Sequence, residues 1–149
     1  MNQNNITIQE VKEFSEELYN AMTELLSQLT NSELSFSPKV LERIVSSQSS
    51  ILFTAVDEDI NNKIVGILTL ATIDIPTGML GRIEDVVVDK SVRGKGIGEK
   101  ITIAAIDKAK AMGIKKIDLT SSPKREVANR LYQRLGFKQR TTNVYRYEV

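Results

Sequence analysis

The stretch "VVVDKSVRGKGIG", residues 86–98, runs from three valines into a basic loop with glycine at every second position from Gly94 to Gly98. Apolar residues then recur at helical spacing from Ile101 to Ala109, and Gly113 ends the pattern. A glycine loop at the head of a helix is a recurrent anion site, because free backbone N–H groups and the positive end of the helix dipole point at the ligand. The stretch therefore predicts a strand, a phosphate-binding loop and a helix.

Two familiar nucleotide-binding motifs do not fit this loop. The P-loop pattern G-x-x-x-x-G-K-[ST] fails, since no lysine and hydroxyl pair follows a glycine at the required distance. The dinucleotide pattern G-x-G-x-x-G also fails, because Glu99 stands where the third glycine should be. Neither a P-loop nor a Rossmann site is expected.

The loop resembles the acetyl-CoA loop of the GNAT superfamily of N-acetyltransferases. The family pattern [QR]-x-x-G-x-[GA] is met by Arg93, Gly94, Lys95, Gly96, Ile97 and Gly98. A second stretch, "ANRLYQRLGF", supplies the asparagine, tyrosine and Gly-Phe pair of that family as Asn129, Tyr132, Gly136 and Phe137. The resemblance covers essentially the whole chain.

The resemblance implies a role for each of these residues. Backbone groups of Val86, Val87 and Val88 would hold the pantetheine arm of acetyl-CoA, and an N–H there would polarise the thioester carbonyl. The loop from Arg93 to Gly98 would hold the pyrophosphate. Asn129 and Tyr132 would touch the same ligand from one helix face, with Tyr132 as general acid. Glu84 is the candidate general base.

Each assignment has a structural alternative. The glycines could serve only a tight turn, although such a turn needs one or two of them rather than three. Arg93 and Lys95 could be ordinary surface charges, and Tyr132 could be a core residue with its hydroxyl at the rim. Glu84 and Asp85 are adjacent in a strand, so they face opposite ways unless a bulge intervenes.

The composition limits the chemistry. The chain has neither cysteine nor histidine, which excludes an acyl-cysteine intermediate, a histidine base, and metal sites built on imidazole or thiolate. We expect no metal, with acetyl-CoA as cosubstrate. Direct attack of an amine on the thioester in a ternary complex is then the simplest route.

The patterning predicts one domain over residues 1–149 with an α/β (α+β) fold. The fold implied by the resemblance is that of GNAT acyltransferases, a central mixed, mostly antiparallel sheet with helices on both faces. The expected strands are residues 6–8, 50–56, 63–73, 82–89 and 116–121, with a terminal hairpin of "FKQR" and "NVYRY". The expected helices span residues 11–29, 38–45, 101–112 and 125–135.

Charge and hydropathy argue against several partners. The net charge is +1, and no basic and aromatic residues interleave, so nucleic acid is not expected as a partner. No apolar run reaches the length of a membrane span and the N-terminus lacks a signal-peptide pattern, so a cytoplasmic protein is expected.

The acceptor is left open by the sequence. Acidic residues on the first helices and at Glu84 and Asp85 suit a cationic amine, whether on a small molecule or a peptide. A catalytically silent acyl-CoA sensor is the main alternative to an enzyme. The oligomeric state, monomer or homodimer, and the use of acyl groups longer than acetyl are also open.

Overall fold

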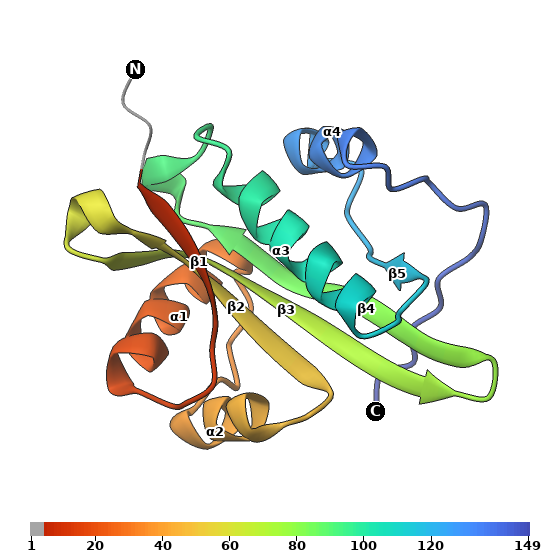
Figure 1. The fold of residues 1–149 in the computed structure, drawn as a ribbon, viewed down its shortest axis with the longest axis horizontal. Coiled ribbons are helices and arrows are strands. Elements are labelled where there is room, and N and C mark those ends of the chain that lie inside the picture. Colours follow the sequence, from red (N-terminus) through yellow and green to blue (C-terminus); the bar gives the residue numbers. More distant parts are fainter. Residues whose placement is uncertain (1–4) are drawn as a thin grey trace. The chain divides into compact units, whose positions relative to one another are not determined.

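The computed structural model describes residues 5–149, which form two compact units, one ending at Leu119 and the other running from Thr120 to Val149 (Figure 1). The strands of the first unit are β1 (Ile6–Glu10), β2 (Ser50–Asp57), β3 (Lys63–Ile75), β4 (Gly78–Val88) and β5 (Ile117–Asp118). Its helices are α1 (Glu16–Leu29), α2 (Pro38–Ser46) and α3 (Ile97–Ala111), with the 3-10 turns η1 (Glu58–Ile60) and η2 (Lys90–Val92). Between residues 5 and 149, no helix has the length and apolar character that crossing a membrane requires.

The five strands form one sheet in the order β1-β2-β3-β4-β5. Neighbours from β1 to β4 are antiparallel, and β5 lies parallel to β4. The predicted mixed, mostly antiparallel sheet is therefore confirmed. Pro76 cannot donate to a strand ladder and Gly78 has a φ of 125°, which is why the long strands turn there.

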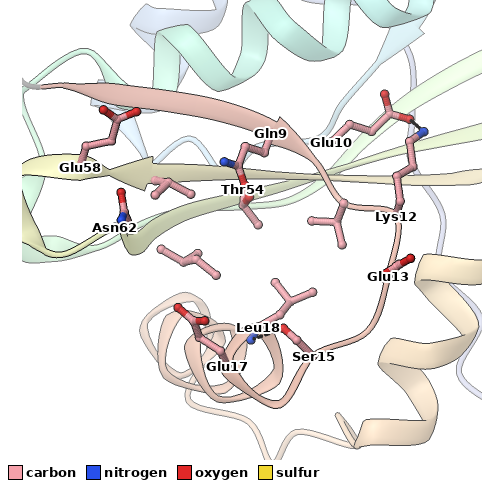
Figure 2. A pocket seen from close by; sticks show the side chains of 13 residues that line it. Gln9, Glu10, Lys12, Glu13, Ser15, Glu17, Leu18, Thr54, Glu58 and Asn62 are labelled. Carbon is pink, nitrogen blue, oxygen red and sulfur yellow. Dashed lines mark hydrogen bonds and ion pairs between the residues drawn. The ribbon is translucent and has the colours of Figure 1, made fainter.

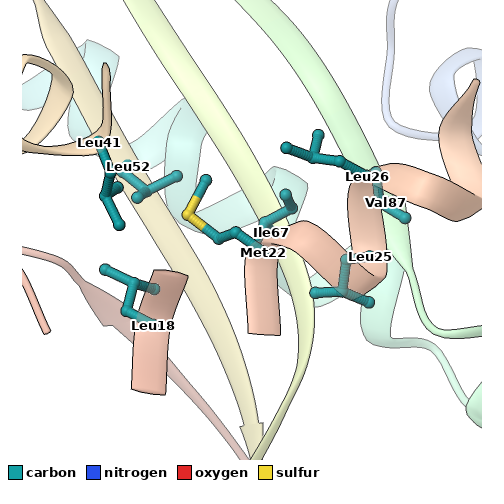
Figure 3. Close-up of a cluster of buried hydrophobic side chains, with 8 residues drawn as sticks. All are labelled: Leu18, Met22, Leu25, Leu26, Leu41, Leu52, Ile67 and Val87. Carbon is teal, nitrogen blue, oxygen red and sulfur yellow. The ribbon is translucent and has the colours of Figure 1, made fainter. Parts of the chain in front are cut away.

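One face of the sheet is covered by α1 and α2. Helix α1 begins later than predicted, at Glu16, because the Ser15 hydroxyl accepts a hydrogen bond from the Leu18 N–H (3.1 Å) and caps the helix. The residues before it, Val11 and Phe14, still pack against the core. Figure 3 shows that core: Leu18, Met22, Leu25, Leu26, Leu41, Leu52, Ile67 and Val87.

The other face of the sheet carries α3 (Figure 1). The α3 stripe of Ile97, Ile101, Ala105 and Ala109 is at most 1% exposed. Small residues let the helix lie close to the strands: a side chain at Gly66 would come within 3.4 Å of Ile97. The helices thus lie on both faces of the sheet, as expected.

The second unit holds α4 (Glu126–Arg134), within one residue of the predicted helix at each end. The predicted terminal hairpin is wrong, since residues 137–149 form no strand. The two segments are short, and Tyr145 and Tyr147 are almost fully exposed, so pairing them would bury little apolar surface. Strand β5 is also shorter than predicted, at Ile117–Asp118.

Candidate functional site

A β-bulge interrupts β4 at Asp85 and Val86. The flanking register pairs are Ile67 with Val87, and Thr69 with Glu84. Leu68 of β3 therefore lies opposite two residues of β4, and Asp85 takes a left-handed φ of 51°. The adjacent carboxylates of Glu84 and Asp85 thus lie where the regular alternation of strand side chains is broken.

The bulge lies on a strand whose outer edge is largely open. Strand β5 pairs with β4 only at Gly81 and Arg82. Along residues 83–88, no described strand pairs with this edge, so backbone N–H and C=O groups there can bind an extended ligand as an added strand would. The Asp89 N–H donates to the Val65 carbonyl of β3 at 2.8 Å, so by alternation the backbone of Val87 also faces β3 and that of Val88 faces the open edge.

The glycine loop continues directly from this strand. Gly94 and Gly96 have φ values of 80° and 76°, and a Cβ built on either would meet nothing within 4 Å. Gly96 is the N-cap of α3 and, as a glycine, offers no side-chain acceptor to the first N–H groups of the helix. The loop is an open cradle of the kind an anionic phosphate fits, at the positive end of a helix.

The glycines differ in what their backbone demands. Gly94 and Gly96 need the left-handed region, which accounts for two of the three. Gly98 lies in the first turn of α3, where the Thr102 hydroxyl donates to its carbonyl (2.7 Å), and its backbone does not require glycine. This agrees with the alanine that the motif allows at that position.

Asp89 fixes the turn between β4 and the loop. Its Oδ1 accepts hydrogen bonds from the Ser91 N–H (2.9 Å) and hydroxyl (2.8 Å), and its Oδ2 lies 3.4 Å from Lys63 Nζ. The bonds from Ser91, with help from Lys63, hold the pKa of Asp89 below its ordinary value of 3.8. Sequence reasoning missed this residue, although aspartate followed two residues later by serine after a strand is a turn signal.

The turn is also tied to α1. The Gln28 side-chain carbonyl accepts a hydrogen bond from the Lys90 N–H at 2.9 Å. Arg93 folds back, and its Nε donates to the Val88 carbonyl at 3.0 Å. Arg93 and Lys95 are both exposed, so the loop presents positive charge to solvent beside the open edge of β4.

The acidic residues at the bulge have different surroundings. Glu84 accepts a hydrogen bond from Arg82 Nε at 2.9 Å through Oε1, which fixes its carboxylate. Partial burial raises the pKa of Asp85 above its ordinary 3.8 although the side chain still reaches solvent, and the charge of Glu84 adds to this rise. Across the described chain, no group of three or more acidic side chains is arranged to hold a metal ion.

In the second unit, Asn129 and Tyr132 lie one turn apart on α4. Tyr132 is 7% exposed, and its ring packs edge-on against Phe137 with centroids 5.8 Å apart. Burial raises the pKa of the Tyr132 phenol above 10, and Arg125 partly offsets the rise. Asn129 donates from Nδ2 to the Ser122 carbonyl at 3.0 Å, so its amide already anchors the start of the helix.

Comparison with known proteins bears on this arrangement. The model of the "Acetyltransferase (GNAT) family" matches residues 15–137. The chain is 31% identical over 125 residues to N-alpha-acetyltransferase 30 of Schizosaccharomyces pombe, covering 82% of this chain and 81% of that protein. It is 36% identical over 70 residues to glucosamine 6-phosphate N-acetyltransferase of Arabidopsis thaliana, a match that covers 47% of this chain and 45% of that enzyme.

A solved structure has a similar fold. The crystal structure of glucosamine-6-phosphate N-acetyltransferase from Arabidopsis thaliana superposes with a TM-score of 0.77 at 27% identity, covering 95% of this chain and 98% of that one. The two folds therefore correspond over nearly their whole lengths.

Proposed function

Since the chain belongs to the acetyltransferase (GNAT) family, we propose that it transfers the acetyl group of acetyl-CoA to a primary amine by direct attack in a ternary complex. The observation that carries this proposal is the open edge of β4 leading into the glycine loop at the head of α3. An extended pantetheine arm suits the edge, and a pyrophosphate suits the loop. Both features lie in the first unit.

The donor would be bound mainly through the backbone. The backbone groups of the Val86 to Val88 segment that face the open edge would pair with the pantetheine amides, and one N–H there would polarise the thioester carbonyl. Gly94, Gly96 and the first turn of α3 would surround the pyrophosphate, with Arg93 and Lys95 adding charge. Arg93 can do this through its Nη atoms while Nε stays on the Val88 carbonyl.

The reaction itself requires three proton movements. An ammonium acceptor loses one proton, its nitrogen attacks the thioester carbon, and the C–S bond breaks as the C–N bond forms. The departing thiolate then takes a proton, and the amide nitrogen loses its second. The products are a neutral acetamide and CoA with a free thiol.

Tyr132 is our candidate donor of the proton to the thiolate. Its raised pKa keeps the phenol protonated at neutral pH, as a general acid requires. The transfer is uphill, because an ordinary phenol has a pKa of about 10 and a thiol one of about 8.5, a difference worth about 2 kcal/mol. Tyr132 would therefore act through positioning, and the phenolate would recover its proton from the reacting amine through water.

Glu84 is our candidate acceptor of the ammonium proton, directly or through a water molecule. Arg82 holds one carboxylate oxygen, and Oε2 has no partner among the described residues. Asp85 beside it adds negative charge that would attract a cationic acceptor. Asn129 would help to bind the donor only if its amide left the Ser122 carbonyl or used its oxygen.

The acceptor class is proposed from the relatives. Their names give an alpha amine and glucosamine 6-phosphate as acceptors of those enzymes. A panel should therefore hold peptides with free N-termini, glucosamine 6-phosphate, an aminoglycoside and an aliphatic oligoamine. The test is thiol release from acetyl-CoA with each amine, together with the mass of the acetylated product. Turnover with one amine supports an enzyme, whereas CoA binding without turnover on any member supports the silent sensor.

A further inference from the structure

A groove of about 500 Å³ opens on the α1 face of the sheet, over β1, β2 and the start of β3 (Figure 2). Helix α1 covers β3 and β4 beside it, where Leu25 and Leu26 belong to the same packed cluster as Val87. The width of α1 therefore separates this groove from the open edge of β4. Its volume lies within the range of small-molecule sites.

A threonine hydroxyl without a protein partner among residues 5–149 opens into the groove. Thr54 of β2 is 2% exposed and lines the groove, and its hydroxyl forms no hydrogen bond with any described residue. The hydroxyl is therefore free to donate to, or accept from, a polar group of a ligand that lies in the groove. The side-chain amides of Gln9 and Asn62 lie in the same lining.

Three carboxylates around the groove are not neutralised by described cations. Glu58 accepts hydrogen bonds from Thr7 and Asn5, which fix its carboxylate at one end (Figure 2). Glu13 and Glu17 lie near the start of α1 and form no ion pair with residues 5–149. Glu10 differs, because Lys12 and Lys108 pair with it.

The wall between these carboxylates is apolar. Leu18 of α1 lines the groove together with Val56 of β2 and Ile64 of β3. The groove thus combines separated carboxylates, an apolar wall between them and the Thr54 hydroxyl. These features match a ligand that has separated cationic ends and a hydrocarbon middle.

We propose that this groove binds an aliphatic oligoamine, at a site separate from the acyl-donor site. Its terminal ammonium groups pair with Glu58 at one end and Glu13 or Glu17 at the other. Its methylenes pack on Leu18, Val56 and Ile64, and an ammonium or amine N–H bonds the Thr54 hydroxyl. Binding in the groove requires no acyl transfer, so it can be tested independently of the proposed function.

The test is calorimetric titration of the full chain with spermidine in the absence of acetyl-CoA. The variant Glu17→Gln/Glu58→Gln removes two groove charges, and Glu33→Gln/Glu42→Gln removes two exposed charges outside the groove. We expect saturable binding that weakens by about five- to tenfold in the groove variant and hardly changes in the control. Thr54→Val, which is nearly isosteric, should also lower the affinity while the melting temperature stays level or rises.

Three results would overturn the proposal. One is the absence of saturable binding, and another is an equal loss in the groove and control variants, which would indicate general charge attraction. The third is displacement of spermidine by excess CoA, which would place the oligoamine at the donor site. Binding that survives CoA, in a protein that acetylates no amine, would support the groove and refute the proposed enzyme.

Discussion

Gly96 allows a charge test at the loop without a change of shape. Its φ of 76° suits asparagine and aspartate better than other side chains. Gly96→Asp and Gly96→Asn should therefore have similar melting temperatures. Because only the aspartate puts a negative charge against the pyrophosphate, we expect CoA affinity to be about tenfold or more lower in Gly96→Asp than in Gly96→Asn. Calorimetry measures both, and equal affinities would place the pyrophosphate elsewhere.

Tyr132 can be tested by removing its hydroxyl alone. In Tyr132→Phe the packing against Phe137 remains, so a general-acid role predicts a fall in kcat of about 10²-fold with little change in CoA affinity. A purely structural hydroxyl predicts instead an unfolding free energy lower by about 1 kcal/mol and unchanged turnover. Full activity in a stable Tyr132→Phe protein would refute the general acid.

The pKa of Tyr132 adds a pH signature. Because the folded pKa is raised, the phenol stays protonated above pH 10, where unfolded tyrosines have begun to ionise. The wild-type rate should fall on the alkaline side above about pH 10, and Tyr132→Phe should lack that fall. The stability from this residue is complete below about pH 10 and is lost as pH rises through the folded pKa. The pH–rate profiles of the wild type and of Tyr132→Phe show whether the alkaline fall in rate belongs to this phenol.

At the level of elements, the turn at Asp89 joins the strand to the loop. Asp89→Ala would leave the Ser91 N–H and hydroxyl without their acceptor and Lys63 with Glu24 alone, so we expect a loss of about 1–3 kcal/mol and weaker CoA binding. The exposed Asp74 at the end of β3 is the control, and Asp74→Ala should change little.

The pH dependence of this turn has the opposite sign to that of Tyr132. The folded pKa of Asp89 is lowered, so its contribution is present above its ordinary value of 3.8 and is lost as pH falls through the folded pKa. Urea unfolding from neutral pH to about pH 3 should thus show the wild type and Asp89→Ala converging in stability. A constant gap between them would contradict this assignment.

The sequence predicted the elements that carry strong local signals. Ser37 and Pro38 begin α2 as expected, and Gly136 follows the end of α4. The terminal hairpin was wrong because β-prone residues such as Val144 and Tyr145 indicate a strand only where a partner buries them. The family resemblance implies a bulge in the strand before the glycine loop, but its exact position at Asp85 depends on the pairing with β3 and carries no local signal.

For the whole molecule, the order of strands and helices and the two motifs were enough to predict the family and the sheet. The groove could not be predicted, because Glu17 is far in sequence from Thr54 and Glu58 and lines the same groove only in the folded first unit. The hydrogen bond from the Lys90 N–H to the Gln28 side chain could not be predicted either, since a single glutamine on a helix forms no recognisable sequence pattern.

The central claim is that CoA binds along the open edge of β4 and in the glycine loop. Amide hydrogen exchange of the full chain, with and without CoA, tests this most directly because it needs no acceptor. We predict the strongest slowing over residues 83–100, and unchanged exchange in β1 and the start of α1. Unchanged exchange over residues 83–100 at saturating CoA would contradict the account.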